Sequence, residues 1–175
     1  GRAPSVEVSA IFAKMPGPAS LYNTSMTTPI AEKTTLAALL SGRLEQTGAK
    51  LHQLAESYPA DQYESAPVAG VRSFAATLRH VAFWNLYLAQ TVQGGAPDGS
   101  ANELPTAETP DKPSLLRALA ASTAEAATAV RALRANLDAG QAELATGIVE
   151  HICEHYGQLA VYARWAGIVP PASRG

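Results

Sequence analysis

The sequence predicts an all-α protein that folds as a four-helix bundle, and three observations support this fold class. The 175 residues are 47% hydrophobic and only 16% charged, and much of the apolar content is alanine, a strong helix former. Four segments place apolar residues at steps of three and four, which is the spacing of one helix face. Alternating runs of Val, Ile and Thr, the pattern of half-buried strands, are scarce. A chain of this length can bury the core of one domain.

The charge balance and the cysteine count exclude several classes of protein. The chain has 13 basic and 15 acidic side chains and a net charge near −2, so we expect neither a nucleic-acid partner nor binding to an anionic membrane surface. Its single cysteine excludes an intrachain disulfide and any Cys-x-x-Cys zinc or redox motif. No apolar run approaches the ~18–20 residues of a membrane span. We therefore expect a cytoplasmic protein, with export after removal of a signal peptide as the alternative.

Residues 1–30 have no long apolar period and contain four prolines, which predicts an irregular arm whose role stays open. A short helical turn is expected within it, around residues 9–15. The arm lacks the charged start and apolar run that are typical of a signal peptide. The predicted organisation is an arm over residues 1–30, a four-helix bundle over residues 31–171 and a tail over residues 172–175.

The first two predicted helices follow the arm. An apolar stripe over residues 36–58 steps by three and four and ends before Pro59, which disfavours helix in the residue that precedes it. The second helix begins near Ser73, a favourable N-cap residue, and runs to Gly94. Large apolar side chains on a second face of this helix predict that it is mostly buried: Phe83, Trp84 and Tyr87.

Two further helices complete the predicted bundle. The third opens at Lys112, which is followed by a proline in the first turn, and is predicted to end at Gly140. Its stripe over residues 116–137 alternates steps of three and four, the seam spacing of bundle packing. The fourth helix is predicted over about residues 141–166 and stops at Gly167.

The connection over residues 94–111 is unusually long and is rich in proline and glycine. Long connections without secondary structure are uncommon in compact domains unless they are functional or cross the fold. An extended chain spans about 3.3 Å per residue, so this segment can traverse the whole length of the second helix. The second and third helices can therefore run parallel, joined by a crossover.

His151 and His155 are the strongest chemical signal in the sequence. They lie four residues apart on the fourth predicted helix, so both imidazoles project from one face, and this face carries the apolar stripe. Imidazoles that point into an apolar core need hydrogen-bond partners or a cation. Spacing alone leaves two interpretations open: a pair of partly buried histidines with polar partners, or two ligands of one metal ion.

His80 is the candidate for a third ligand. It lies within the mostly buried second helix, where a lone histidine is usually a core residue with a hydrogen-bond partner. Three neutral imidazoles would leave the full charge of a divalent ion and at least one open coordination position, as in catalytic rather than structural sites.

The residues around these histidines resemble a known family. The segment 71–84, with an Arg-Ser cap before the helix that carries His80, resembles the second helix of the DinB/YfiT-like metalloenzymes. The segment 151–171 resembles the last helix of that family, with His-x3-His followed by Gly-Gln, Tyr-x-Arg, Gly and Pro-Pro. Residues 54–63 also resemble the family's link between its first two helices. The resemblance covers about residues 33–171.

The resemblance implies an up-down-down-up bundle, a homodimer, and a divalent ion, nickel or zinc, bound by the matching residues His80, His151 and His155. Relatives include transferases of low-molecular-weight thiols such as bacillithiol and a mycothiol-dependent maleylpyruvate isomerase. The leading hypothesis is therefore a metalloenzyme whose open coordination positions take water or a thiolate, and whose partner is a small molecule. The alternatives are metal-dependent hydrolysis and a non-catalytic metal- or ligand-binding stress protein.

Several other residues have both a functional and a structural interpretation. Glu154 is a candidate to support the metal ligands or act as a general base, although a solvated helix residue is the plainer interpretation. Cys153 is expected to be a buried, inert thiol, and His52 a surface residue. Trp84 and Tyr87, one turn beyond the first histidine, are candidates to line a pocket. Ile152 stands where many relatives carry an aspartate.

Overall fold

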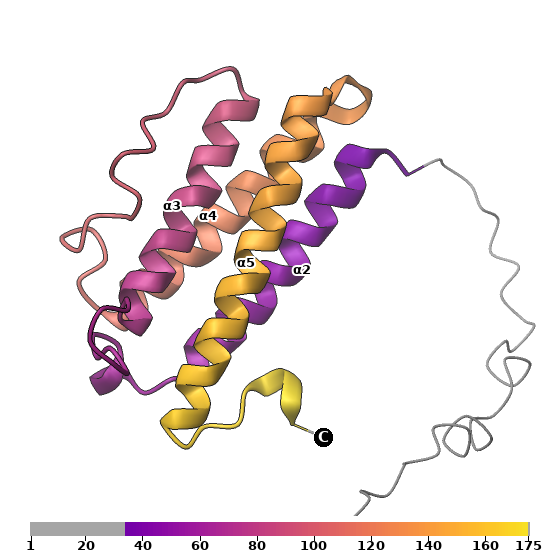
Figure 1. Cartoon of the computed structure of the whole chain (residues 1–175). Coiled ribbons are helices and arrows are strands. Elements are labelled where there is room, and N and C mark those ends of the chain that lie inside the picture. Colours follow the sequence, from indigo (N-terminus) through magenta and orange to yellow (C-terminus); the bar gives the residue numbers. More distant parts are fainter. Residues whose placement is uncertain (1–33, 175) are drawn as a thin grey trace, which may run out of the picture. The chain divides into compact units, whose positions relative to one another are not determined.

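The computed structural model describes residues 34–174, and within this range it contains four long helices and no strand (Figure 1). The predicted arm over residues 1–30 lies outside the described residues. Single turns of 3-10 helix separate or follow the long helices. The long helices are α2 (Leu36–Ser57), α3 (Phe74–Val92), α4 (Lys112–Leu133) and α5 (Ala139–Trp165), and the short turns are η2 (Ala60–Gln62), η3 (Arg134–Asn136) and η4 (Pro171–Ser173).

The helices form the predicted bundle with an up-down-down-up order. In Figure 1, α3 and α4 run in one direction while α2 and α5 run in the other, and the crossover returns along α3 to the start of α4. Each of α2 and α3 packs against both α4 and α5. The core between the four helices consists of the predicted apolar stripes, including fully buried Leu44, Leu78, Leu119 and Ile152.

A polar side chain caps the N-terminus of each of the four long helices. The Thr35 and Ser73 hydroxyls accept hydrogen bonds from backbone N–H groups three residues later, at 3.1 and 3.0 Å. Asp111 and Asp138 each form a reciprocal capping box, in which the residue three positions on also bonds to the backbone N–H of the cap. At the other ends, Gly94 and the glycine at 167 adopt positive φ angles of 87° and 74° and stop their helices as predicted.

The predicted end of the third helix is wrong. α4 ends at Leu133, because Arg134 leaves the helical conformation with φ +49°. The capping box at Asp138 then starts α5 at Ala139. Gly140 therefore lies in the first turn of α5 and does not end a helix. The apolar stripe misled the prediction because its spacing continues through Leu137, which packs against the core from the connection.

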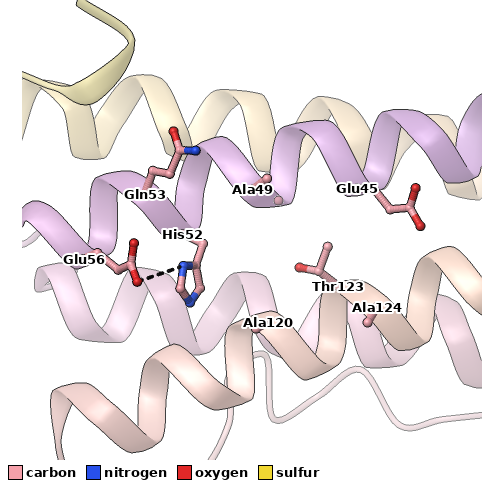
Figure 2. Close-up of a pocket in the computed structure, with 9 residues that line it drawn as sticks. Glu45, Ala49, His52, Gln53, Glu56, Ala120, Thr123 and Ala124 are labelled. Carbon is pink, nitrogen blue, oxygen red and sulfur yellow. Dashed lines mark ion pairs between the residues drawn. The ribbon is translucent and has the colours of Figure 1, made fainter. Parts of the chain in front are cut away.

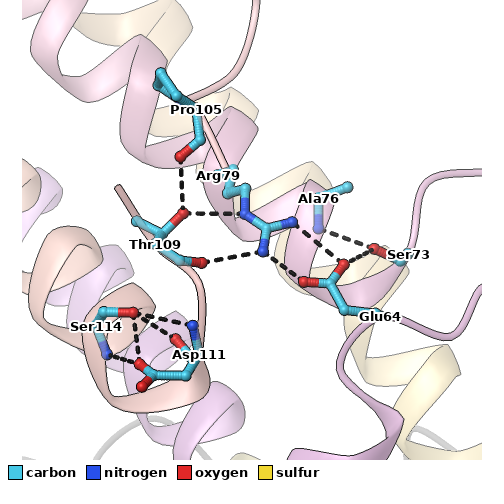
Figure 3. Close-up of polar contacts among 8 residues, drawn as sticks. All are labelled: Glu64, Ser73, Ala76, Arg79, Pro105, Thr109, Asp111 and Ser114. Atoms are coloured by element: carbon cyan, nitrogen blue, oxygen red, sulfur yellow. Dashed lines mark hydrogen bonds and ion pairs between the residues drawn. The ribbon is translucent and has the colours of Figure 1, made fainter. Parts of the chain in front are cut away.

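The crossover over residues 93–111 is fastened to α3 by polar contacts (Figure 3). The buried Arg79 guanidinium donates from Nε to the Thr109 hydroxyl at 3.0 Å and from Nη2 to the Thr109 carbonyl at 3.1 Å. The same guanidinium pairs with the Glu64 carboxylate, which follows η2. The Leu104 amide donates to the Arg79 carbonyl at 3.3 Å. These contacts hold the crossover against the helix that carries the first predicted metal ligand.

Across residues 34–174, no helix combines the length and the hydropathy that a membrane span requires.

Candidate metal centre

Antiparallel packing of α3 and α5 brings the three predicted histidines together. His80 projects from α3 and is 8% exposed, whereas His151 and His155 project from α5 and are half-buried. The Nε2 atom of His151 lies 2.8 Å from Nε2 of His80 and 3.1 Å from Nε2 of His155. Within residues 34–174 this is the one cluster of three or more His, Cys, Asp or Glu side chains whose ligand atoms lie within 4.8 Å of one another.

Hydrogen bonds on the far side of two rings determine where their protons are. His80 Nδ1 lies 2.6 Å from the carbonyl oxygen of Asn102, and His155 Nδ1 lies 2.9 Å from Oε1 of Gln158. Gln158 in turn donates from Nε2 to the Tyr162 hydroxyl at 2.7 Å, which is consistent with this orientation of its amide. Because carbonyl oxygens only accept, both Nδ1 atoms carry hydrogen, and in the neutral form of each ring the Nε2 atom presents a lone pair to the cluster.

The third ring cannot satisfy both of these lone pairs. His151 Nε2 faces the other two Nε2 atoms, and a neutral ring with hydrogen on Nε2 offers only one hydrogen. Its Nδ1 atom is buried without a hydrogen-bond partner. A divalent cation fits this arrangement, because nitrogens bound at ~2.0–2.1 Å to one ion lie about 3 Å apart and all three lone pairs are then used.

The electrostatics of the site favour neutral rings at His80 and His151. Burial lowers the pKa of His151 to about 4, with smaller contributions from the two neighbouring histidines and from Arg72. Burial likewise lowers the pKa of His80, partly offset by its bond to Asn102. Both rings are therefore neutral at pH 7, which is the state that binds a metal ion.

Trp84 and Tyr87 lie at different distances from the cluster. The Trp84 ring is 6.3 Å from the His80 ring and 6.5 Å from the His151 ring, measured between centroids. Tyr87 packs against Trp84, at 4.9 Å, and lines a separate pocket of about 320 Å³ between α3 and the crossover. Trp84 thus lies beside the imidazoles, and Tyr87 supports it from the next turn.

The remaining candidates lie elsewhere. The Glu154 side chain is exposed and makes none of the hydrogen bonds found in the described residues. Cys153 is exposed, which corrects the expected buried thiol: with Ile152 in the core, the next residue points outward. His52 Nδ1 lies 3.8 Å from Oε1 of Glu56 and faces a pocket of about 460 Å³ between α2 and α4 (Figure 2), apart from the three-histidine cluster.

Sequence reasoning missed two residues of this site. Gln158 follows His155 by three positions on a helix, so spacing alone places it on a neighbouring part of the same face. Asn102 lies in the crossover and reaches His80 through its backbone carbonyl, for which the sequence carries no signal.

Comparison with known families agrees with this geometry. The family model of the DinB superfamily matches residues 43–159, more than half of the chain. The chain belongs to the DinB superfamily. The matched range contains the whole of α3, the crossover and all three histidines. No curated protein matches the sequence. DinB membership thus rests on the family model, and the predicted resemblance is confirmed.

Proposed function

We propose that this DinB superfamily protein is a metalloenzyme in which Nε2 atoms of His80, His151 and His155 bind one divalent ion, nickel or zinc. The observation that carries the proposal is the convergence of three Nε2 atoms. Two of them present lone pairs in their neutral rings, because their Nδ1 atoms donate to carbonyl oxygens. Without a cation, His151 can donate one hydrogen to only one of these two lone pairs, and the other lone pair has no donor.

The chain's own residues prepare the site for such an ion. Burial keeps the His80 and His151 rings neutral, and the bonds to Asn102 and Gln158 orient two of the three rings. When bound, a divalent ion with three neutral ligands acts as a Lewis acid that lowers the pKa of a thiol or water. The Trp84 ring lies beside the His80 and His151 rings in an edge-on arrangement and adds an apolar surface next to the site.

The proposed reaction is transfer of a low-molecular-weight thiol to an electrophile, or a thiol-dependent isomerisation. In the transfer, the thiol S–H bond breaks and its proton passes to solvent. A bond forms between the thiol sulfur and the electrophilic carbon, while the bond from that carbon to its leaving group breaks and the leaving group departs with the electron pair. Membership of the DinB superfamily and the open, neutral-ligand chemistry of the site support this class. The proposed partner is therefore a small molecule.

Metal analysis tests the site directly. We expect the purified wild-type protein to bind about one equivalent of nickel or zinc at neutral pH, and the His151→Ala variant to lose most of it. His52→Ala is the matched control, because this histidine lies on α2 and faces α4, and it should retain the metal. Wild-type protein without stoichiometric metal, or a His151→Ala variant with undiminished metal, would contradict the proposal.

Activity measurements separate the possible reactions. The metal-loaded protein is incubated with several cellular thiols and an electrophilic acceptor, and in parallel with ester and amide substrates. Metal-dependent consumption of the thiol supports transfer. Turnover of the esters or amides alone would replace it with hydrolysis, and the absence of metal-dependent turnover would replace it with a binding role.

The homodimer that the resemblance implies is part of the proposal. Three large apolar side chains at the end of α5 and beyond are exposed in the single chain: Val161, Trp165 and Val169. Sedimentation or light scattering of wild-type protein should give twice the mass of the chain, and a monomer at all concentrations would contradict it.

A further inference from the structure

We propose that Asn102 is a positioning residue that holds His80 as the Nδ1–H tautomer, so that its Nε2 lone pair points at His151 and His155. The contact that carries this inference is the 2.6 Å separation between His80 Nδ1 and the Asn102 carbonyl oxygen. The importance of the tautomer for metal binding rests on the proposed function, whereas the tautomer itself is a property of the metal-free protein.

Two side chains one turn apart on α3 contact the same residue of the crossover. His80 donates to the Asn102 backbone carbonyl, and the Trp84 indole donates from Nε1 to the Asn102 side-chain oxygen at 2.9 Å. The indole bond fixes the side chain of Asn102, and the imidazole bond uses its backbone. The position of the Asn102 carbonyl therefore depends on the Asn102 side chain as well as on the backbone of the crossover.

The backbone conformation of Asn102 makes this residue type important. Its φ angle is +60°, in the left-handed region that most side chains avoid and that asparagine and glycine tolerate. An alanine at this position would favour a negative φ, which turns the carbonyl away from its present direction. A non-glycine residue in this conformation next to a cluster of candidate ligands is typical of a functional constraint.

The crossover is also held on both sides of Asn102. On the C-terminal side, the Leu104 amide donates to the Arg79 carbonyl at 3.3 Å, and Thr109 binds the Arg79 guanidinium. On the N-terminal side, Gly99 packs against α3, where a Cβ atom on it would be in ordinary van der Waals contact with the Trp84 and Tyr87 rings, at 3.4 and 3.5 Å. The contact between Asn102 and His80 is thus one of several contacts that hold the crossover against α3.

The consequence for the site follows from imidazole chemistry. A neutral imidazole without an acceptor at Nδ1 can carry its hydrogen on Nε2, and an Nε2–H group directed into the cluster cannot bind an ion. The crossover therefore determines whether Nε2 of His80 presents a lone pair that can bind an ion. His155 has a comparable partner within its own helix, Gln158, whereas His151 has none at Nδ1.

Nitrogen-15 NMR of the imidazole rings in metal-free protein tests the tautomer. Chemical shifts distinguish protonated from unprotonated ring nitrogens, and the His80 signals are assigned by their disappearance in a His80→Gln variant. We expect wild-type His80 to show the Nδ1–H pattern and Asn102→Ala to lose it. Asn102→Gly, which accommodates the positive φ, should keep most of it, and Trp84→Phe should weaken it.

Zinc titration of the same variants provides the second measurement. We expect Asn102→Ala to raise the dissociation constant for Zn²⁺ by about 10-fold or more, as for other residues that orient metal-binding histidines, and Asn102→Gly to recover part of the affinity. Asn136→Ala, an exposed asparagine in η3, is the matched control and should match wild type in both measurements.

Two outcomes would overturn the inference. One is an Asn102→Ala variant that keeps both the Nδ1–H pattern and the wild-type affinity. The other applies if Asn102→Ala does not fold: a Trp84→Phe variant with unchanged shifts and affinity would then overturn it. If wild-type protein shows the Nδ1–H pattern but binds neither zinc nor nickel, the proposed function fails while the assignment of Asn102 stands.

Discussion

At the scale of single residues, a close approach between α2 and α4 depends on the absence of one side chain. A Cβ atom built on Gly48 of α2 would lie 2.3 Å from Cγ2 of Thr123 on α4. Thr123 cannot easily turn away, because its hydroxyl donates to the Leu119 carbonyl at 2.9 Å and accepts from Asn85 at 3.2 Å. The glycine thus permits the contact between α2 and α4.

Replacement of this glycine should destabilise the protein. We expect Gly48→Ala to lower the free energy of unfolding by about 1–3 kcal/mol, as overpacking of a core does. Gly42→Ala is the matched control on the same helix, because a Cβ atom there meets nothing within 4 Å, and it should stabilise by up to ~1 kcal/mol through helix propensity. Urea unfolding of both variants measures the difference, and equal effects would contradict the close contact.

The Glu64 carboxylate should make stability depend on pH in the acid range. Its hydrogen bond to Arg79 holds the pKa below the usual value of 4.5. A lowered pKa means that the ionised form stabilises the fold: the contribution is complete above pH 4.5 and is lost as the pH falls through the folded-state pKa. Glu64→Gln should therefore lower Tm at pH 7, and the difference from wild type should shrink toward pH 3.

A matched carboxylate provides the control for this titration. Glu45 pairs with Arg131 at 2.8 Å, but both side chains are about half exposed, and exposed ion pairs contribute little. Glu45→Gln should shift Tm less than Glu64→Gln at neutral pH. A Tm difference for Glu64→Gln that stays constant from pH 7 to pH 3 would show that the ionised carboxylate does not stabilise the fold.

At the scale of elements, the start of α5 determines where the second ligand helix lies. Asp138 accepts from the Gln141 amide at 2.8 Å, and the Gln141 side chain accepts from the Asp138 amide at 3.1 Å. Asp138→Ala should cost about 1 kcal/mol of stability, because the cap and its reciprocal bond are lost. Glu143→Ala is the control, because Glu143 is exposed and lies two residues beyond Gln141. It should leave the stability nearly unchanged in the same unfolding experiment. Equal losses would contradict the capping box.

Most of the helices could be predicted from the sequence, because residues that favour helix ends stand at their boundaries. Ser73 and Lys112-Pro113 mark two helix starts, and Gly94 marks an end, and all three lie where the structure has them. The end of α4 could not be predicted. Arg134 adopts a positive φ, and an arginine in the sequence does not indicate such a conformation. Periodicity also continued past that break and concealed the new cap at Asp138.

The candidate site divides in the same way. His151 and His155 could be grouped from their spacing, and the burial of the second helix made His80 a candidate. The bond from His80 to the Asn102 carbonyl could not be predicted, because it depends on the path of an irregular segment and on a backbone atom common to every residue type. Sequence patterns report side chains on regular elements much better than backbone atoms in loops.

At the scale of the whole molecule, the proposed ion should stabilise the fold, because all three ligands come together only in the folded bundle. A metal at 100 times its dissociation constant adds about 2.7 kcal/mol if it binds only the folded state, which corresponds to a rise in Tm of roughly 5–10 °C for a domain of this size. Thermal unfolding with and without a chelator measures this shift. The shift should vanish in His151→Ala and persist in His52→Ala.

The sequence separation of the ligands has a consequence for the order of folding. His151 and His155 share one helix, whereas 71 residues separate His80 from His151. An unfolded chain that forms α5 can hold an ion with two imidazoles, but the third joins only after the entropy of a long loop closure has been overcome. During refolding, the spectrum of a bound cobalt ion should therefore change twice, and the second change would time the moment at which α3 docks against α5.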